Sequence, residues 1–454
     1  MTVAPKYFSY ADTGAPSLTG QVGKLTDIFD ECLVLARQFT AVSAGSFVDN
    51  SVEARLEGGT AFKLFQGPTA ANDEAYFGLR QPFEQIVLKF GTAGVGGTAI
   101  YEYWNGSTWT TFAPTDGTAS LTADGTISWS IASLTGWVAN SVNSVTAYWI
   151  RIRFSGTYST NPLVNSATIT GWAVAYSGTN KRIYRMGAGS AGLMFRVQDD
   201  GNNYGTGSAS SAGALEAQWA GCETASDVDT TTNEFPTAVQ ISTRLTFRKS
   251  NSLDATARTW FILADDRTAI VIIDFGEAVG TTPATRYVVC YMGEIYSVQP
   301  GDPWKVMAIG RYTPNSGGFL AQDDNVSNID AVVLGNFIAR AFTGLAGSLA
   351  VGKHPAGHLS GGGVLSNGSL NYPNGPDGGV YLGEIWITEP VQKCVRGKLR
   401  GWWAWHHAQA AAADLTVISG ANQLAGRTFK LHRSLGNGNG MMGFETSNTW
   451  PVSS

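Results

Sequence analysis

Histidines are the residues of this chain best suited to metal binding or to acid–base chemistry near neutral pH, and there are five. His354 and His358 have the H-x3-H spacing that places two metal ligands on one face of a helix. Pro355 and Gly357 interrupt such a helix, so a solvated loop is the favoured interpretation and a metal site the weaker alternative. The adjacent histidines at 406–407 follow three tryptophans, which favours packing over catalysis.

Carboxylates can serve as general acid and base, and four adjacent pairs occur in the chain. They are Asp73-Glu74, Asp199-Asp200, Asp265-Asp266 and Asp323-Asp324. A glycosidase needs two carboxylates about 5–9 Å apart across a cleft, whereas neighbours in a strand point to opposite sides of it. The pairs that precede Gly201 and Arg267 fit β-turns better. Calcium binding in an Asp-rich loop stays open, although the D-x-D-x-D-G spacing is absent.

Other motifs of catalysis and metal binding are missing from the sequence. It contains neither GxSxG nor the phosphate-binding GxxxxGK[ST]. Its four cysteines are widely scattered and form no CxxC pair, so we expect buried thiols rather than a zinc ribbon or a redox motif. We therefore predict no catalytic residue, no metal site and no cofactor, and we expect that the chain is not an enzyme.

The composition indicates β structure and assembly. The 454 residues suffice for two to four domains. Only 14% of them are charged, against about 25% in ordinary globular proteins, while there are 55 glycines and 14 tryptophans. We expect mainly β structure, with much surface buried between subunits. The net charge of −5 gives no global field for nucleic acid. We also expect no signal peptide and no membrane-spanning segment, because no apolar stretch approaches about 20 residues.

The stretch IYEYWNGSTWTTF at residues 100–112 predicts a β-hairpin. Aromatic and polar residues alternate on both sides of Asn105-Gly106, a dipeptide that tolerates the positive φ of a tight turn. This rim of rings is a candidate surface for a glycan or a protein partner. Its members are Tyr101, Tyr103, Trp104 and Trp109.

A second strand is predicted at Tyr148–Phe154, YWIRIRF. Isoleucine and phenylalanine form one face, and the other face carries an indole and two guanidiniums. The polar face is a candidate for holding an exposed aromatic ring or for pairing with another chain. The residues on it are Trp149, Arg151 and Arg153.

Two shorter segments, TISWSI at 126–131 and LTGWV at 134–138, lie between these strands. The four segments together predict part of an antiparallel sandwich or jelly roll. Their arrangement resembles β-sandwich modules that recur in structural proteins of tailed bacteriophages, notably baseplate, tail-fibre and other virion accessory proteins. The resemblance covers roughly residues 48–176.

One short N-terminal helix is predicted within Leu18–Ala36, with Thr26 as its N-cap. Its apolar stripe is interpreted either as core packing or as a subunit contact, through Leu25, Ile28, Phe29 and Leu33. The segment APSLTGQVGKLTDIFDECLV at 15–34 resembles the N-terminal segment of a group of phage virion structural proteins. In that group the helix leads soon to segments like GWAVAYSGTNKRIYRM at 171–186 and FRVQDDG at 195–201, and the chain often closes with a strand like GFETSNTW at 443–450.

About 130 residues separate these segments here. The resemblance therefore implies that 48–167 is an inserted sandwich module, and that 1–40 and 168–454 form one β-rich body. A linear arrangement of three domains is the alternative.

Three features of the C-terminal part remain open. Residues 313–380 are rich in Gly, Ser and Asn and predict long loops ordered by a partner. GWWAWHHAQAAAA at 401–413 is a second helical candidate, or equally a strand. The hexapeptides YMGEIY at 291–296 and YLGEIW at 381–386 are interpreted either as duplicated strand pairs or as a coincidence in a Gly-rich chain.

The expected fold is thus mainly β, with antiparallel sandwich or jelly-roll domains, one short helix and Gly-rich loops. The resemblance implies a non-enzymatic virion structural protein on the tail or baseplate, made in the host cytoplasm, whose partners are other copies of itself and other virion proteins. A capsid-decoration or neck protein is an alternative. Another is a tail-borne glycan binder or depolymerase that stacks host surface sugars on Trp104 and Trp109, although no β-helix period occurs.

Overall fold

A computed structural model gives the fold, and its strands pair antiparallel, apart from one isolated parallel bridge between Leu56 and Val174. The predicted mainly β class is confirmed. The structure describes residues 4–41, 46–67, 73–187, 194–201, 216–232, 234, 245–250, 252–274, 287–298, 304–311, 336–341, 348–353, 381–389, 394–406, 415, 417–420, 422–433, 441–447 and 450. Among these, no helix is long and apolar enough to cross a membrane.

The predicted helix is present as α1 (Lys24–Phe29), which continues into a π-helical turn, η1 (Asp30–Val34). Thr26 is not its N-cap. That position is held by Gly23, and the hydroxyl of Thr26 donates to the Gly23 carbonyl from inside the helix. A second short helix that the sequence did not reveal, α2, spans Ser51–Arg55.

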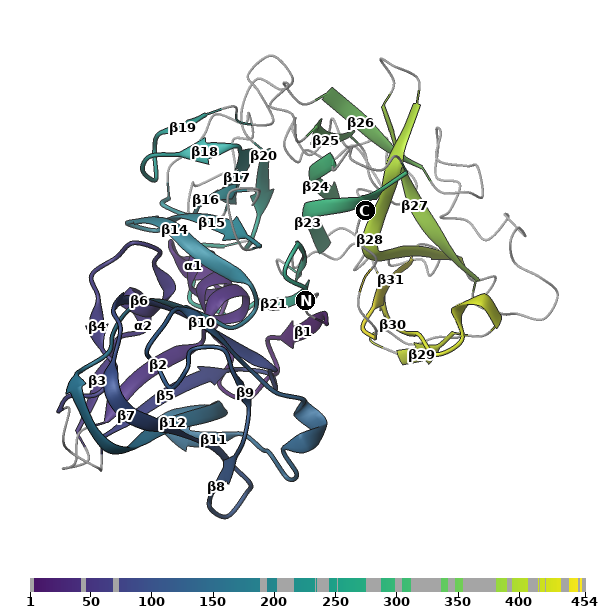
Figure 1. Cartoon of the computed structure of the whole chain (residues 1–454). Coiled ribbons are helices and arrows are strands. Elements are labelled where there is room, and N and C mark those ends of the chain that lie inside the picture. Colours follow the sequence, from purple (N-terminus) through teal and green to yellow (C-terminus); the bar gives the residue numbers. More distant parts are fainter. Residues whose placement is uncertain are drawn as a thin grey trace.

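The sandwich consists of two sheets that share an apolar core, in the purple to blue part of Figure 1. The first has the order β3-β2-β5-β12-β7-β8, with β11 paired to β12. Its strands are β2 (Arg37–Ala41), β3 (Phe47–Asp49), β5 (Glu74–Leu79), β7 (Val95–Trp104), β8 (Trp109–Phe112), β11 (Asn140–Val142) and β12 (Val145–Thr160). The second, in order, is β4 (Phe62–Lys63), β13 (Leu163–Thr168), β6 (Gln85–Thr92), β10 (Gly125–Ser128) and β9 (Thr115–Asp116).

The sandwich begins earlier in the chain than residue 48. β2 is hydrogen-bonded to β5, so residues 37–41 belong to the first sheet. The hairpin expected at 100–112 is formed by β7 and β8, with Trp104 paired to Trp109 and a loop at 105–108. The 134–138 segment is a turn rather than a strand, and a short 3-10 helix, η2 (Ile131–Ser133), precedes it.

A five-stranded sheet packs against α1 on the side of the helix that faces away from the sandwich (Figure 1). Its strands, in order, are β14 (Trp172–Gly178), β15 (Lys181–Met186), β16 (Met194–Gln198), β17 (Glu216–Cys222) and β20 (Leu245–Arg248). A separate two-stranded ribbon joins β18 (Thr224–Ala225) to β19 (Thr231–Thr232).

The largest sheet combines the N-terminal strand with the C-terminal half of the chain. In order, it contains β1 (Lys6–Ser9), β21 (Thr259–Ala264), β22 (Thr268–Asp274), β23 (Tyr287–Ser297), β24 (Trp304–Arg311), β25 (Asn336–Ala341), β26 (Ser348–Lys353), β27 (Tyr381–Glu389), β28 (Cys394–His406), β31 (Met441–Glu445), β30 (Thr428–Arg433) and β29 (Val417–Ser419). A further 3-10 turn, η5, spans Asn422–Leu424. Because β23 also pairs with β28, the six strands from β23 to β28 close into a ring.

The open C-terminal predictions have different outcomes. Residues 401–406 continue strand β28, so this part of the second helical candidate is a strand, and 407–413 lie outside the described residues. Within 313–380, only β25 and β26 are described; the rest, with His354, His358 and Asp323-Asp324, lies outside. Three cysteines are buried thiols, as expected: Cys32, Cys222 and Cys290.

Candidate binding surface

Two of the predicted contact residues face the sandwich core instead of a partner. Tyr101 and Tyr103 are each 6% exposed. The Tyr101 hydroxyl donates to Asp116 at 2.7 Å and the Tyr103 hydroxyl to the Thr135 carbonyl at 3.1 Å. Burial and Asp116 raise the pKa of Tyr101 well above its ordinary value, so it stays a protonated donor. Both rings therefore pack in the core of the sandwich.

Trp149 lies on the opposite, outer face of the same sheet, but it is fully buried there. It packs against Phe39 and Tyr76 in a second apolar cluster, and its indole N–H donates to the Asn140 carbonyl of β11 at 2.9 Å. A Cβ on Gly78 would lie 2.6 Å from the Trp149 ring, so the strand beneath the indole needs glycine. The β11 segment thus covers Trp149, which is not available to a partner.

The two predicted guanidiniums form an ion-pair network with carboxylates that sequence reasoning missed. Arg151 donates to Glu102 at 2.6 Å and to Glu74 at 2.8 Å. Arg153 donates to Glu102 at 2.5 and 2.9 Å. Burial alone would raise the pKa of Glu102, but hydrogen bonds from Arg153 and Arg151 outweigh it and lower this pKa. The sequence could not predict this network, because it does not reveal the strand register that places Arg151 opposite Glu102.

Trp109 and Trp104 are the predicted rings that remain half-buried on this outer face. They meet at 5.7 Å in an edge-to-face arrangement across the hairpin. The Arg151 guanidinium lies 4.5 Å from the centroid of Trp109, and Tyr76 contacts the same ring at 5.5 Å. Since the arginines are paired with carboxylates, this surface would bind a ligand by stacking and hydrogen bonding rather than by net charge.

The four apolar residues of α1 and η1 lie in the interior of the chain. Leu25, Ile28, Phe29 and Leu33 are at most 1% exposed. The Phe29 ring contacts Tyr184 at 5.9 Å and Trp219 at 5.6 Å. Of the two interpretations of this stripe, core packing is the one that the structure describes.

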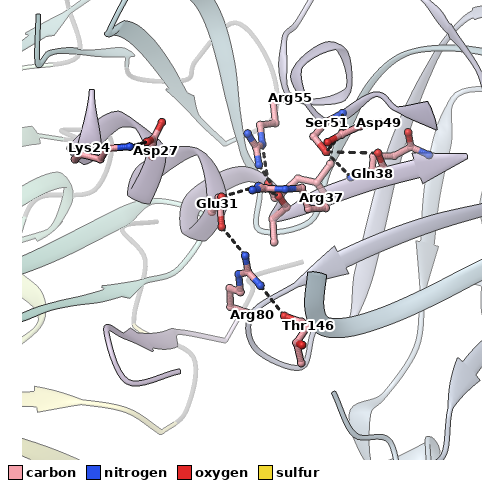
Figure 2. Close-up of polar contacts among 12 residues, drawn as sticks. Lys24, Asp27, Glu31, Arg37, Gln38, Asp49, Ser51, Arg55, Arg80 and Thr146 are labelled. Atoms are coloured by element: carbon pink, nitrogen blue, oxygen red, sulfur yellow. Dashed lines mark hydrogen bonds and ion pairs between the residues drawn. The ribbon is translucent and has the colours of Figure 1, made fainter. Parts of the chain in front are cut away.

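A buried polar joint connects η1 to the sandwich (Figure 2). Glu31, 6% exposed, accepts from Arg37 at 2.6 Å and from Arg80 at 2.8 Å. Arg80 also donates to the Thr146 carbonyl at 2.6 Å. Arg55 of α2 donates to the Leu35 carbonyl at 2.7 Å. Side chains from α2, β2 and the end of β5 thus converge on the segment where the helix ends.

The opposite side of the helix is fixed to the five-stranded sheet by two carboxylates. Asp30 accepts from the Tyr184 hydroxyl at 2.8 Å and from Arg182 at 3.1 Å. Asp199 accepts from the backbone N–H of Leu25 at 2.8 Å and forms a buried ion pair with Lys249. Asp199 therefore accepts a hydrogen bond from a free backbone N–H at the start of the helix, as an N-cap side chain would, although it is distant in sequence.

Every described member of the acidic pairs except Asp266 has a structural partner, and the buried Oδ1 of Asp266 has no hydrogen-bond partner among the described residues. Burial raises the pKa of Asp199 to about 6, and Asp265 is held in a buried ion pair with Arg400. Asp266 has a pKa raised to about 6 by burial and by the neighbouring Asp265. Asp73 accepts from the Gly67 N–H. Within the described residues, no group of three or more His, Cys, Asp or Glu side chains could hold a metal ion.

Comparisons with protein families and with curated proteins identify no relative of this chain. No protein-family model matches the chain, and no curated protein matches its sequence significantly. A functional proposal therefore depends on the geometry of the chain and on the resemblance of its segments.

Proposed function

We propose that this chain is a non-enzymatic structural component of a bacteriophage virion, assembled as a symmetric homo-oligomer on the tail or baseplate. The proposal is carried by the packing of three segments, at 15–34, 171–186 and 195–201. In the phage proteins that these segments resemble, they follow one another in the chain. Here the sandwich separates the first from the other two, and yet all three form one packed unit.

Hydrogen bonds at the base of the sandwich support its interpretation as an insertion. The Ile169 N–H donates to the Val34 carbonyl at 3.4 Å, and the Thr170 hydroxyl donates to the Leu33 carbonyl. The chain thus leaves the body and returns to it at adjacent positions, as an insertion into a host loop would. The joint around Glu31 would then fix the angle between module and body, which suits a component of a rigid particle.

The use of its carboxylates supports a non-enzymatic role. Asp199 and Asp265 are committed to buried ion pairs with Lys249 and Arg400. Breaking a buried pair by removing one partner typically costs about 3–5 kcal/mol, so these acids have a structural task that constrains them. The same reasoning suits a capsid-decoration or neck position equally well.

Particle association tests this proposal. Particles from cells that carry the coding sequence would be purified on a density gradient, and their peptides quantified against a known capsid protein. We expect this chain to co-purify at a fixed number of copies per particle, at a multiple set by the particle symmetry. Recovery only in the particle-free lysate would contradict a virion role.

Glycan binding is a second candidate, favoured by the half-buried Trp104 and Trp109. Neutral sugars are the expected class, because the guanidiniums beside these rings are already paired with carboxylates. On a glycan array, Trp104→Ala and Trp109→Ala should each reduce a wild-type signal by a factor of about 5 to 150, taking as a guide the roughly 1–3 kcal/mol that a nucleic-acid base gains by stacking on an aromatic ring. Val138→Ala, an exposed residue beside the hairpin, is the matched control. Absence of any wild-type signal would remove this candidate.

A further inference from the structure

The similarity between the two hexapeptides extends over a longer stretch. Residues 283–300 and 373–390 align without a gap. Six positions are identical: the first copy has Pro283, Tyr291, Gly293, Glu294, Ile295 and Pro300, and the second has Pro373, Tyr381, Gly383, Glu384, Ile385 and Pro390. The next aromatic position is conservatively exchanged, Tyr296 for Trp386. A constant spacing with matching prolines at both ends favours duplication over coincidence.

The two copies lie on opposite edges of one strand and in the same register. β23 and β27 both run antiparallel to β28. Lys398 of β28 is paired with Tyr296 on one side and with Trp386 on the other. Gly397 follows the same pattern and lies between Ser297 and residue 387. Equivalent positions of the repeat therefore meet at Lys398.

The Lys398 side chain lies between the two rings that the copies supply. Its ammonium nitrogen is 5.2 Å from the Tyr296 centroid and 5.6 Å from the Trp386 centroid. It also forms an ion pair with Glu384 at 2.5 Å. The equivalent acid of the first copy, Glu294, pairs with Arg267 at 3.1 Å. Each copy thus brings one ring and one carboxylate that holds a cation.

The same motif contains the point where the ring of six strands closes. β23 pairs with β22 as far as Gly293 and with β28 from Ile295 onward. Gly293 has φ +136°, and a Cβ there would lie 2.4 Å from the Arg267 carbonyl oxygen, so the switch between neighbours needs glycine. Among the described residues, the seam to β28 has three paired positions and one further backbone hydrogen bond, from the Val298 N–H to the Arg396 carbonyl at 3.2 Å. Backbone pairing at this seam is therefore short, so contacts between side chains matter more for holding β23 against β28.

We propose that Tyr296, Lys398 and Trp386 form a clasp that holds the six-stranded ring closed, and that a duplicated strand motif supplies the two rings of this clasp. The inference goes beyond the virion proposal, because it concerns the chain alone and holds wherever the protein acts. The half-buried ammonium contacts an aromatic ring on each neighbouring strand, so its loss loosens both contacts at once.

Hydrogen exchange of the full chain, read by mass spectrometry, tests the clasp. Lys398→Met removes the ammonium and keeps an unbranched side chain. We expect exchange in peptides that span 294–298 and 396–400 to become roughly tenfold faster, the size set by two cation–π contacts and one partly buried ion pair. Lys398→Arg, which retains the cation, should exchange like the wild type. Unchanged exchange at the seam in Lys398→Met would overturn the proposal.

A matched control separates the clasp from general loosening. Lys430 also places its ammonium over a ring, 4.1 Å from the Tyr7 centroid, but away from this seam. Lys430→Met should leave exchange at 294–298 and 396–400 unchanged. If it accelerates these peptides as much as Lys398→Met does, the effect is not specific to the clasp and the proposal fails.

The equivalence of the two rings is tested separately. Tyr296→Leu and Trp386→Leu should each accelerate exchange at the seam, by factors that agree within about threefold, because the rings lie at similar distances from Lys398. Tyr296→Trp and Trp386→Tyr should preserve wild-type exchange. An effect confined to one of the two leucine variants would contradict a clasp built from equivalent copies.

Discussion

Replacing Glu31 by glutamine tests whether the buried joint holds the sandwich on the body. The substitution keeps the size of the side chain and one acceptor oxygen, and it removes the negative charge. Glu31 accepts from Arg37 at 2.6 Å and from Arg80 at 2.8 Å, as Figure 2 shows. The change therefore isolates the charge of one carboxylate that pairs with Arg37 of β2 and with Arg80, which directly follows β5.

The expected loss of stability follows from the burial of the partners. The side chain of Glu31 is 8% exposed and that of Arg80 is 5% exposed, so a neutral glutamine at this position would leave a buried guanidinium without its counter-ion. Breaking a buried ion pair from one side costs about 3–5 kcal/mol. The retained acceptor offsets part of this, which gives an expected destabilisation of about 2–3 kcal/mol.

The assay is urea unfolding of the full chain, followed by tryptophan fluorescence and by far-ultraviolet circular dichroism. Two probes are needed because a chain of this size need not unfold in one step. Asp27→Asn on the same helix is the control: its ion pair with Lys24 joins side chains that are 48% and 37% exposed. Exposed pairs of this kind contribute about 0–1 kcal/mol, so the control should differ little from the wild type.

The outcome that would refute this reasoning is equal unfolding of Glu31→Gln and Asp27→Asn. A second arm examines the coupling. In Glu31→Gln/Arg80→Met the guanidinium left unpaired is also gone, so the double variant should be less destabilised than the sum of the two single changes. Strict additivity would mean that the two side chains do not act as a pair.

Two further predictions concern a close approach and a buried imidazole. Gly78→Ala should destabilise the chain by about 1–3 kcal/mol, because its Cβ would lie 2.6 Å from the Trp149 ring; an unchanged melting temperature would contradict this. Burial lowers the pKa of His432 to about 3, so only the unfolded chain takes up this proton as the pH falls below about 6.5. Stability contributed by neutral His432 should therefore decline between pH 6.5 and pH 3, by about 2–3 kcal/mol at pH 4.5. His432→Gln keeps a partner for the Tyr7 hydroxyl, 3.1 Å away in the wild type, and should lack this decline; parallel stability profiles of the two proteins would show that the imidazole is not responsible.

Alternation along the chain was sufficient to predict the strands, but not which of their faces would be covered. Residues 100–112 and 148–154 do form strands of one sheet. The two tyrosines at 101 and 103 face the core, while Trp149 on the other face is covered by β11. A period of two assigns residues to opposite faces, and only contacts distant in sequence decide what lies over each face.

Prediction of the helix failed at one residue for the same reason, because the contact that decides it is distant in sequence. Its apolar spacing predicted α1 correctly, whereas Thr26 looked like a local N-cap. The group that accepts the Leu25 N–H is Asp199, which is 174 positions away in the chain. For Gly401 onward, closely spaced tryptophans fit a helix and a strand equally well, and the pairing of β28 with β27 and β31 decided for the strand.

Electron cryomicroscopy of purified particles tests the central claim most directly. We predict that this chain can be traced in the map as a symmetric layer on the tail or baseplate, with the sandwich held at a constant angle to the body by the joint around Glu31. A map of the complete particle without this chain would contradict the account. So would a position at a fibre tip where Trp104 and Trp109 line an open cleft with facing carboxylates, since that arrangement belongs to a glycan-active protein.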